Sequence, residues 1–265
     1  MLTIKNVSKT FNKGTVNEKK ALQHLNLHLL PGDFATVIGG NGAGKSTMLN
    51  MIAGVYPIDA GTIEIDGVNI SRMPEHQRAK YIGRVFQDPM MGTAAGLEIQ
   101  ENLALAFRRG RARTLHWGLK QSEKEYYKEM LEKLGLGLHT RMTSKVGLLS
   151  GGQRQALTLL MSTLVKPKIL LLDEHTAALD PKTAKKVLDL TEEFVKEQNL
   201  TALMITHNMH DAIALGNRLI MMHEGHIIYD VSGEEKKKLR VEDLLKKFEE
   251  ASGGQFSNDR MLLAK

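Results

Sequence analysis

The chain contains the segment Gly39-Gly40-Asn41-Gly42-Ala43-Gly44-Lys45-Ser46-Thr47. A short apolar strand is predicted before it at Phe34–Ile38, and a helix is predicted after it at Lys45–Ala53, with Gly54 as C-terminal cap. Gly, four residues and then Gly-Lys-Ser/Thr, between a strand and a helix, indicates a phosphate-binding loop. Glycines let successive backbone N–H groups point at an anion, and the helix dipole adds its positive end.

Two side chains of this loop carry the expected chemistry. Lys45 is expected to reach the β- and γ-phosphates of a nucleoside triphosphate, and the Ser46 hydroxyl to coordinate Mg²⁺. An ordinary glycine-rich turn is the alternative, which the complete pattern in this context disfavours. The residues expected to bind the nucleotide here are Gly39, Gly40, Asn41, Gly42, Ala43, Gly44, Lys45, Ser46 and Thr47.

A second predicted strand, Ile169–Leu172, ends in two acids. A carboxylate at such a strand end holds Mg²⁺ in phosphate-loop enzymes, so Asp173 is the candidate metal residue, acting through water. Glu174 is then placed to polarise the water that attacks the γ-phosphate. A solvated acidic loop is the alternative, and it is the better interpretation only if the pair is considered without the phosphate loop.

His207 follows another predicted strand, Thr201–Thr206. A neutral imidazole there can contact the γ-phosphate and orient the water. The chain has ten histidines, and a single histidine usually has no catalytic role. The position of His207 favours function, because open α/β sheets bind ligands at the carboxyl ends of their strands.

Composition narrows the possible classes of protein. A chain of 265 residues is one large domain, or one domain with an inserted subdomain. The absence of cysteine excludes disulfides, thiolate zinc sites and a catalytic cysteine. No signal pattern opens the chain, and no apolar run approaches the about 20 residues that span a bilayer. The net charge of +6 suits nucleic acid, an anionic membrane, a polyphosphate ligand or an ordinary soluble surface.

Strand and turn signals dominate the beginning of the chain, including alternating leucines at Leu25–Leu29, and a mainly helical pattern follows from about Leu97 to Val165. The α/β pattern then returns. The remaining expected features are a capping box at Ser122–Glu125 opening a helix through Leu134, a helix capped by Ser150, a helix from Asp180-Pro181 to about Gln198, a helix at Asn208–Leu215, a hairpin around Glu224-Gly225, and an apolar helix face of Val241, Leu244, Leu245 and Phe248.

The run Leu149-Ser150-Gly151-Gly152-Gln153 resembles the signature sequence of ATP-binding-cassette (ABC) ATPases. Other family motifs follow in order over about residues 1–230. Phe11 matches the aromatic residue that stacks on adenine, and Gln87 matches the glutamine-loop residue that senses Mg²⁺ and the permease. Asp173-Glu174 resembles the Walker B end, Ala178-Leu179-Asp180 the D-loop, and His207 the switch histidine.

The resemblance implies an α/β fold, a P-loop NTPase core of the ABC type with an antiparallel β subdomain and an inserted helical subdomain at about residues 88–165. The ATPase domain would span residues 1–235, with a C-terminal helix and flexible tail over 236–265. It also implies a head-to-tail homodimer in which each ATP lies between Lys45 of one subunit and the signature of the other. The signature residues implied to bind ATP are Ser150, Gly151, Gly152 and Gln153.

As an ABC protein without membrane-spanning helices, the chain would bind a separate permease at the cytoplasmic face of the cell membrane. It would act indirectly with a substrate-binding protein and would not need nucleic acid. Two departures from the family pattern stand out: Gly40 and His175 each replace a usual proline, and we expect hydrolysis to remain normal. Both resemble a bacterial subgroup encoded with a substrate-binding lipoprotein and described as importing aromatic amino acids.

The leading hypothesis is therefore an ATPase subunit of an importer of a small solute, with an amino acid as the candidate cargo. A non-transport ABC ATPase acting on ribosomes or DNA is the alternative. The chain has one cassette, however, and about 100 residues without sustained heptads separate Ser46 from Leu149. A third class is a binding module that does not turn over, and the presence of Glu174 and His207 disfavours it.

Two segments keep two interpretations each. The first is a basic stretch that contains Arg108, Arg109, Arg111, Arg113, His116 and Lys120, with Trp117. It would either contact anionic lipid or the permease, or form a solvated loop, and the solvated loop is favoured. The segment after Gln87 would form part of the permease groove or pack in the core, with equal weight; it comprises Met90, Met91 and Leu97.

Overall fold

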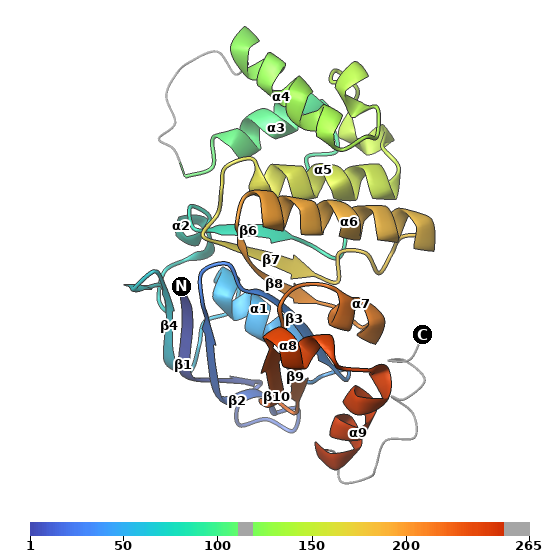
Figure 1. The fold of residues 1–265 in the computed structure, drawn as a ribbon. Helices are drawn as coiled ribbons and strands as arrows, with labels where there is room; N and C mark the ends of the chain where they lie inside the picture. Colours follow the sequence, from blue (N-terminus) through green and yellow to red (C-terminus); the bar gives the residue numbers. More distant parts are fainter. Residues whose placement is uncertain (111–118, 252–265) are drawn as a thin grey trace. The chain divides into compact units, whose positions relative to one another are not determined.

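The computed structural model describes residues 1–110 and 119–251 (Figure 1). The chain divides into two compact units. The first combines Met1–Arg78 with the segment that begins at Leu200, and the second is Ala79–Asn199. The helical insertion expected at about residues 88–165 lies inside the second unit.

The first unit contains the following elements: β1 (Leu2–Phe11), β2 (Lys19–Leu29), β3 (Phe34–Gly39), α1 (Lys45–Ala53), β4 (Ala60–Ile65), β5 (Val68–Asn69), α2 (Glu75–Arg78), β8 (Thr201–Ile205), α7 (Met209–Ala214), β9 (Arg218–His223), β10 (His226–Ser232), α8 (Gly233–Lys237) and α9 (Val241–Ala251). The second unit contains β6 (Ile82–Val85), α3 (Ile99–Phe107), α4 (Gln121–Lys133), the short 3₁₀ helices η1 (Leu138–Thr140) and η2 (Val146–Leu148), α5 (Gly151–Thr163), β7 (Ile169–Asp173) and α6 (Pro181–Glu197).

An antiparallel sheet in the first unit has the strand order β2-β1-β4-β5. Leu25, Leu27 and Leu29 of β2 are buried, whereas the intervening Asn26 and His28 are exposed. This alternation is that of a strand with one face in the core, and it confirms the pattern read from the sequence.

A second set of strands in this unit, β8-β3-β9-β10, holds the phosphate loop. β3 runs parallel to both β8 and β9, and β10 returns antiparallel to β9. All six residues of β3 are buried, as expected for a strand with parallel neighbours on both edges. The chain leaves β3 at Gly39 and enters α1 at Lys45, so the loop lies at the carboxyl end of a central strand.

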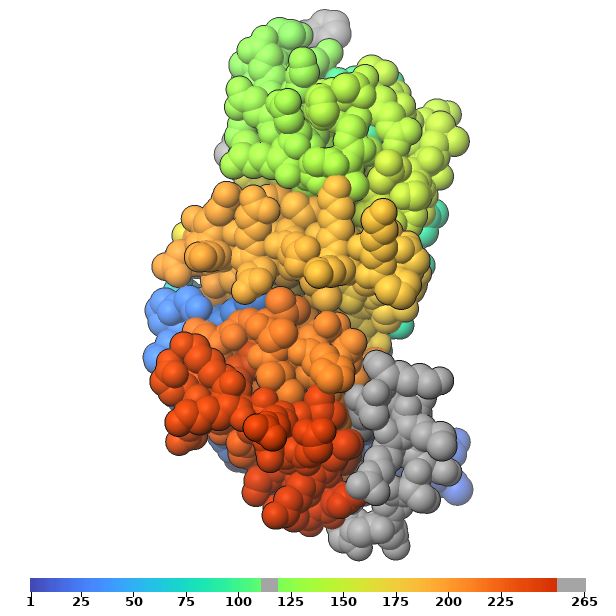
Figure 2. All heavy atoms as spheres, turned by 45° about the vertical axis from the view of Figure 1, so that its right-hand side comes forward, coloured from blue at the N-terminus to red at the C-terminus, as the bar shows by residue number. Residues whose placement is uncertain are grey.

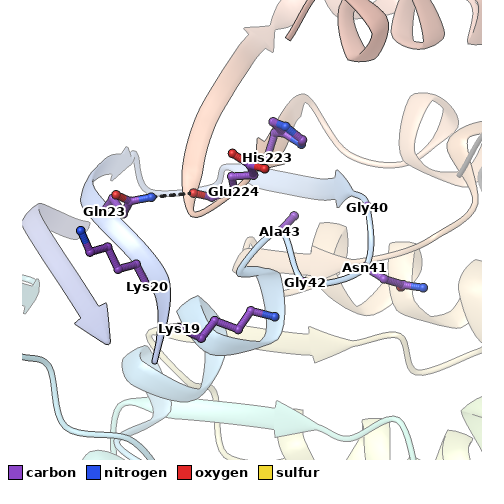
Figure 3. A pocket seen from close by; sticks show the side chains of 9 residues that line it. All are labelled: Lys19, Lys20, Gln23, Gly40, Asn41, Gly42, Ala43, His223 and Glu224. Atoms are coloured by element: carbon purple, nitrogen blue, oxygen red, sulfur yellow. Dashed lines mark hydrogen bonds between the residues drawn. The ribbon is translucent and has the colours of Figure 1, made fainter. Parts of the chain in front are cut away.

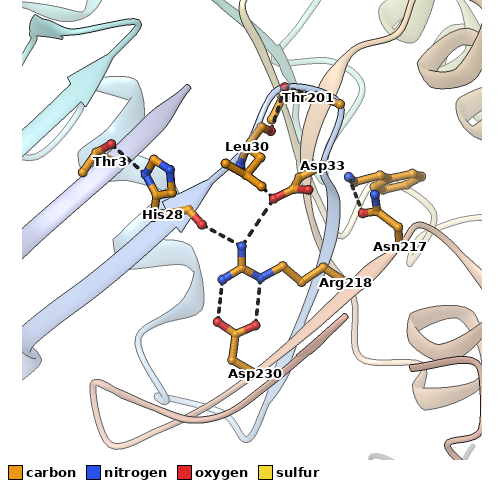
Figure 4. A network of polar contacts seen from close by, with 10 residues as sticks. Thr3, His28, Leu30, Asp33, Thr201, Asn217, Arg218 and Asp230 are labelled. Carbon is orange, nitrogen blue, oxygen red and sulfur yellow. Dashed lines mark hydrogen bonds and ion pairs between the residues drawn. The ribbon is translucent and has the colours of Figure 1, made fainter. Parts of the chain in front are cut away.

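Arg218, at the start of β9, joins several of these segments (Figure 4). Its Nε and Nη2 donate to the two carboxylate oxygens of Asp230 on β10, at 2.8 and 2.6 Å. Its Nη1 donates to the His28 carbonyl at 2.6 Å and to Asp33 Oδ2 at 3.3 Å. The hydrogen bond to Asp230 raises the pKa of Arg218 above its ordinary value. This network fixes the turn that leads into β3.

The C-terminal helix α9 packs on its own unit. Leu244 and Phe248 are buried in one cluster with Met209 of α7 and Met221 of β9, and Val241 is among the partly buried residues against it. In Figure 2 the red atoms of this segment lie against the orange atoms of α7. The predicted apolar face is therefore confirmed, while the predicted flexible tail from about Ser252 lies outside the described residues.

In the second unit, β6 and β7 are parallel, and α5 contacts α3, α4, α6 and β6. Ser150 caps α5 as predicted, with its Oγ accepting from the Gln153 N–H at 3.3 Å. Asp180 caps α6 before Pro181, also as predicted. Within the described ranges, no helix is long and apolar enough to cross a membrane.

The capping box predicted at Ser122–Glu125 is wrong by two residues. α4 begins at Gln121 with Lys120 at the N-cap, and the Glu123 carboxylate accepts from the Lys120 N–H at 3.4 Å. The carboxylate of the glutamate at the third helical position accepts from the backbone N–H three residues before it. That interaction sets the N-cap position, whatever side chain the capping residue has. A serine nearby was therefore a misleading signal.

Candidate functional site

The turn between β9 and β10 holds the phosphate loop through backbone hydrogen bonds. The Gly225 N–H donates to the Ala43 carbonyl at 3.0 Å, and the Gln23 N–H donates to the Gly225 carbonyl at 3.1 Å. Gly44, with φ of 102°, fits this close approach, since a Cβ there would lie 2.6 Å from the Ala21 carbonyl oxygen. The loop shape is thus set by β2 and the β9–β10 turn together.

Lys45 lies at the first position of α1 and is 5% exposed. Its Nζ donates to the carbonyls of Gly39 at 2.7 Å and Gly40 at 3.1 Å. The ammonium group is therefore held over the strand end from which the loop begins. Asn41, Gly42 and Ser46 are exposed, so the outer rim of the loop is open to a ligand.

A cavity of about 390 Å³ adjoins this loop (Figure 3). Two lysines of β2 border it, and a Cβ on Gly42 would lie 3.1 Å from Lys19 Nζ. The residues that line it are Lys19, Lys20, Gln23, Gly40, Asn41, Gly42, Ala43, His223 and Glu224. Lys19 and Lys20 could not be predicted from the sequence, because nothing in a local pattern shows that the start of β2 lies beside the loop.

Two further predicted residues belong to this first unit. Val37 pairs with Ile205, and the Thr206 N–H donates to the Val37 carbonyl at 3.1 Å. Two residues on, His207 is level with Gly39, so the histidine and the loop share the carboxyl edge of adjacent parallel strands. Phe11, at the end of β1, is half-buried, and its ring packs edge-on to Tyr56 at 5.2 Å between centroids.

The acidic pair lies in the second unit at the end of β7. Val85 pairs with Leu172, which places Gln87, two residues beyond Val85, level with Glu174. Both acids are half-buried and Gln87 is exposed. Glu174 has a φ of 45°, in the left-handed region that few residues other than glycine adopt.

Arg84 is a neighbour that sequence analysis missed. It pairs with Leu171, so it shares a strand face with Asp173, and its Nη2 lies 3.9 Å from Asp173 Oδ2. Its guanidinium lies 4.4 Å from the centre of the Phe86 ring. Arg84 and Phe86 are two residues apart on a strand, so the sequence already indicates that their side chains lie on the same face. That this face also carries Asp173 follows only from the strand register.

The signature segment begins α5 in the same unit. Ser150 and Gly151 are exposed, and the Gln153 side chain accepts from the Ser150 N–H at 3.2 Å. Gly152 is buried, and a Cβ there would lie 2.0 Å from Thr183 Cγ2, so a small residue is needed where α5 meets α6. A cavity of about 320 Å³ is lined by Leu136, Ser150, Gly152, Gln153, Lys182, Thr183, Lys186, Val187 and Leu190.

The segments with two interpretations are partly resolved. Arg108 pairs with Glu123 at 2.9 Å, and Arg109 donates to the Ser162 carbonyl at 2.9 Å, so these two arginines bind their own chain. Lys120 is exposed at the N-cap of α4, and the remaining members, Arg111, Arg113, His116 and Trp117, lie outside the described residues. For the segment after Gln87, the interpretation as core packing is wrong. Met90 is 45% exposed, Met91 is 70% exposed and Leu97 is 37% exposed.

A phosphate loop at the end of a central parallel strand, with a buried lysine at the first position of the following helix, defines a P-loop nucleoside triphosphatase. Comparison with known proteins narrows this class. The family model described as "ABC transporter" matches residues 22–177. The chain therefore belongs to the ABC transporter family, as an ATP-binding subunit that hydrolyses ATP.

Individual relatives and solved structures support the same family assignment. The chain is 44% identical over 251 residues to a tyrosine transport ATP-binding protein of Clostridioides difficile, covering 95% of this chain and all of that protein. It is 35% identical over 232 residues to a methionine import ATP-binding protein of Bartonella henselae, covering 86% of this chain and 64% of that one. A dimeric ATP-binding cassette bound to ADP and phosphate matches with TM-score 0.75 and 29% identity, covering 88% of this chain and 98% of that chain.

Proposed function

We propose that the chain powers import of an amino acid, of the aromatic kind, through a separate permease. The relatives named for tyrosine transport and methionine import support the direction and the class of cargo. The observation that carries the ATP-driven part of the proposal is that one chain presents both a phosphate loop with an exposed rim and an exposed signature serine at a helix start. The two features are the complementary halves of an ATP site that opens and closes between subunits.

Each site residue has a proposed role. Lys45 binds the β- and γ-phosphates, and Phe11 stacks on the adenine, with Tyr56 supporting its ring. Glu174 orients and polarises the attacking water, as a base within hydrogen-bond reach, and His207 contacts the γ-phosphate. The placement of Lys45, Glu174 and His207 just beyond the carboxyl ends of parallel strands supports their roles.

Mg²⁺ fits the oxygen donors that the chain offers. The Ser46 hydroxyl is exposed on the first turn of α1, and the half-buried Asp173 carboxylate ends β7. Both are hard oxygen ligands of the kind that Mg²⁺ takes together with nucleotide phosphates. Gln87 is the third proposed contact. When bound, the ion neutralises charge that develops on the phosphates, while Asp173 and Ser46 fix where it binds.

The functional unit is proposed to be a head-to-tail homodimer. The first turn of α5 has no acidic residue, so its free N–H groups and the Ser150 hydroxyl suit the γ-phosphate of an ATP held by the other subunit. A twofold arrangement forms both sites at once. The solved cassette dimer bound to ADP and phosphate supports this assembly.

This dimer can be tested by cross-linking, because the chain contains no cysteine. We expect a Glu174→Gln protein that carries both Asn41→Cys and Gly151→Cys to form covalent dimers with a short bismaleimide when ATP is present. A Cβ at position 151 meets Leu179 Cδ2 at 3.5 Å, an ordinary contact, so the cysteine is tolerated. Dimer yield on denaturing gels is the measurement.

Each single-cysteine protein is the control, since a head-to-tail pair brings position 41 to the other subunit's 151 and not to its own copy. Equal yield without ATP, or from either single variant, would contradict the arrangement.

The permease is proposed to bind the exposed segment that contains Met90, Met91 and Leu97, because flexible methionine side chains suit adaptable contacts. The subunit would then lie at the cytoplasmic face of the membrane, with a substrate-binding protein delivering cargo on the other side. We expect proteoliposomes with the permease, the binding protein and enclosed ATP to accumulate labelled tyrosine. Vesicles made with Lys45→Ala are the control.

ATPase stimulation by the permease without uptake of tyrosine or another amino acid would contradict the cargo class. Failure to bind the permease, together with co-sedimentation with ribosomes or DNA, would instead favour the non-transport ABC class.

A further inference from the structure

His175, the residue directly after Glu174, is anchored inside the second unit. Its side chain is 2% exposed, and its Nε2 lies 3.0 Å from Oγ1 of Thr191, which is fully buried on α6. This contact joins the segment that leaves β7 to α6, a helix that begins six residues further along. Both elements are labelled in Figure 1. The residue before the anchor is the proposed base of the reaction.

The direction of this hydrogen bond follows from the other bond of Thr191. The threonine hydroxyl has one proton, and Oγ1 donates it to the Val187 carbonyl at 2.8 Å. Oγ1 must therefore accept from His175, so the proton of the imidazole is on Nε2. Complete burial lowers the pKa of His175 to about 4, which keeps the ring neutral at pH 7. The ring is thus a fixed neutral donor.

Glu174 needs such an anchor, because its backbone is strained. A φ of 45° is unfavourable for a residue with a side chain, and it persists only where neighbouring contacts hold it. One contact is local: the Ala177 N–H donates to the Glu174 carbonyl at 3.0 Å. The hydrogen bond from His175 to Thr191 is a second contact, and it fixes the segment to helix α6.

We propose that His175 and Thr191 are positioning residues for hydrolysis: their hydrogen bond holds the Glu174 backbone so that its carboxylate meets the attacking water. The proposal rests on the role of Glu174 given above. A general base loses effectiveness when it moves by about an ångström, while nucleotide binding does not depend on it. Loss of the anchor therefore lowers kcat and leaves ATP affinity unchanged.

Thr191→Val removes the acceptor at nearly constant volume, and Thr191→Ser keeps it. We expect Thr191→Val to lower kcat about tenfold with unchanged KM for ATP and unchanged binding of a fluorescent ATP analogue. Thr191→Ser should stay within about twofold of the parent. In a Glu174→Gln background, Thr191→Val should change the residual rate little, because residues that act through one group are not additive.

A second pair covers the case in which Thr191→Val does not fold. His175→Gln offers an amide N–H at similar reach and should keep most of kcat, whereas His175→Leu should lose about tenfold. Equal rates for these two, or a parental kcat in folded Thr191→Val, would overturn the positioning role. Parental hydrolysis by Glu174→Gln would overturn the role of Glu174 itself, so the two failures are distinguishable.

Discussion

Glu174→Gln is expected to lower kcat for ATP hydrolysis about 10³-fold while the protein still binds ATP and dimerises on it. The amide has the shape of the carboxylate but cannot accept a proton from water, and general-base catalysis contributes about 10²- to 10⁴-fold. In the proposed dimer hydrolysis lets the two subunits part, so the variant should remain in the closed dimer. Phosphate release and size-exclusion chromatography with and without ATP measure the two effects.

Glu192→Gln is the matched control, since Glu192 is an exposed acid on α6 in the same unit. It should hydrolyse ATP at the parental rate and dimerise only transiently. Lys45→Ala should lose hydrolysis by a different route, through loss of nucleotide binding. A Glu174→Gln protein that turns over ATP like the parent would remove the proposed base from the mechanism.

The free energy of unfolding is expected to fall by about 3 kcal/mol between pH 6.5 and pH 4 because of His175 alone. Burial lowers its folded-state pKa from 6.5 to about 4, so in this range the unfolded chain binds the proton and the folded chain does not. The contribution is complete above pH 6.5 and is lost as the pH falls toward 4. Its size follows from about 1.4 kcal/mol for each pKa unit.

Urea unfolding of the nucleotide-free protein at a series of pH values measures this dependence, with His175→Gln as the comparison. The difference between the two proteins isolates His175 from carboxylates that titrate nearby, such as Asp211, whose pKa burial raises. Curves that stay parallel from pH 7 to pH 4 would mean that the imidazole is not buried as described.

Local signals in the sequence were sufficient for much of the fold. Gly54 ends α1 with φ of 91°, Ser150 and Asp180 cap their helices, and Glu224-Gly225 turns the hairpin. Each of these features is decided within a few residues of chain, where backbone conformation and capping chemistry are local. The misplaced cap of α4 shows the limit, since Ser122 has a favoured capping side chain and the observed cap, Lys120, does not.

The sequence proposes members of the candidate site but not its geometry, and it did not propose Arg84. Motif spacing identified Lys45, Asp173 and Glu174, because the chemistry of phosphate and metal requires those residue types. The positions of His207 level with Gly39 and of Arg84 beside Asp173 depend on which strands pair and in which register. Those pairings join residues far apart in the chain, so a single sequence carries no direct record of them.

The turn at Glu224-Gly225 also limits how this protein can be shortened. The family model ends at residue 177, yet the backbone groups that hold Ala43 and Gln23 come from Gly225. A minimal fragment for crystallisation or split-protein reporters therefore has to retain β9 and β10. Removing them would leave every residue of the nucleotide motif in place and still take away the support that shapes it.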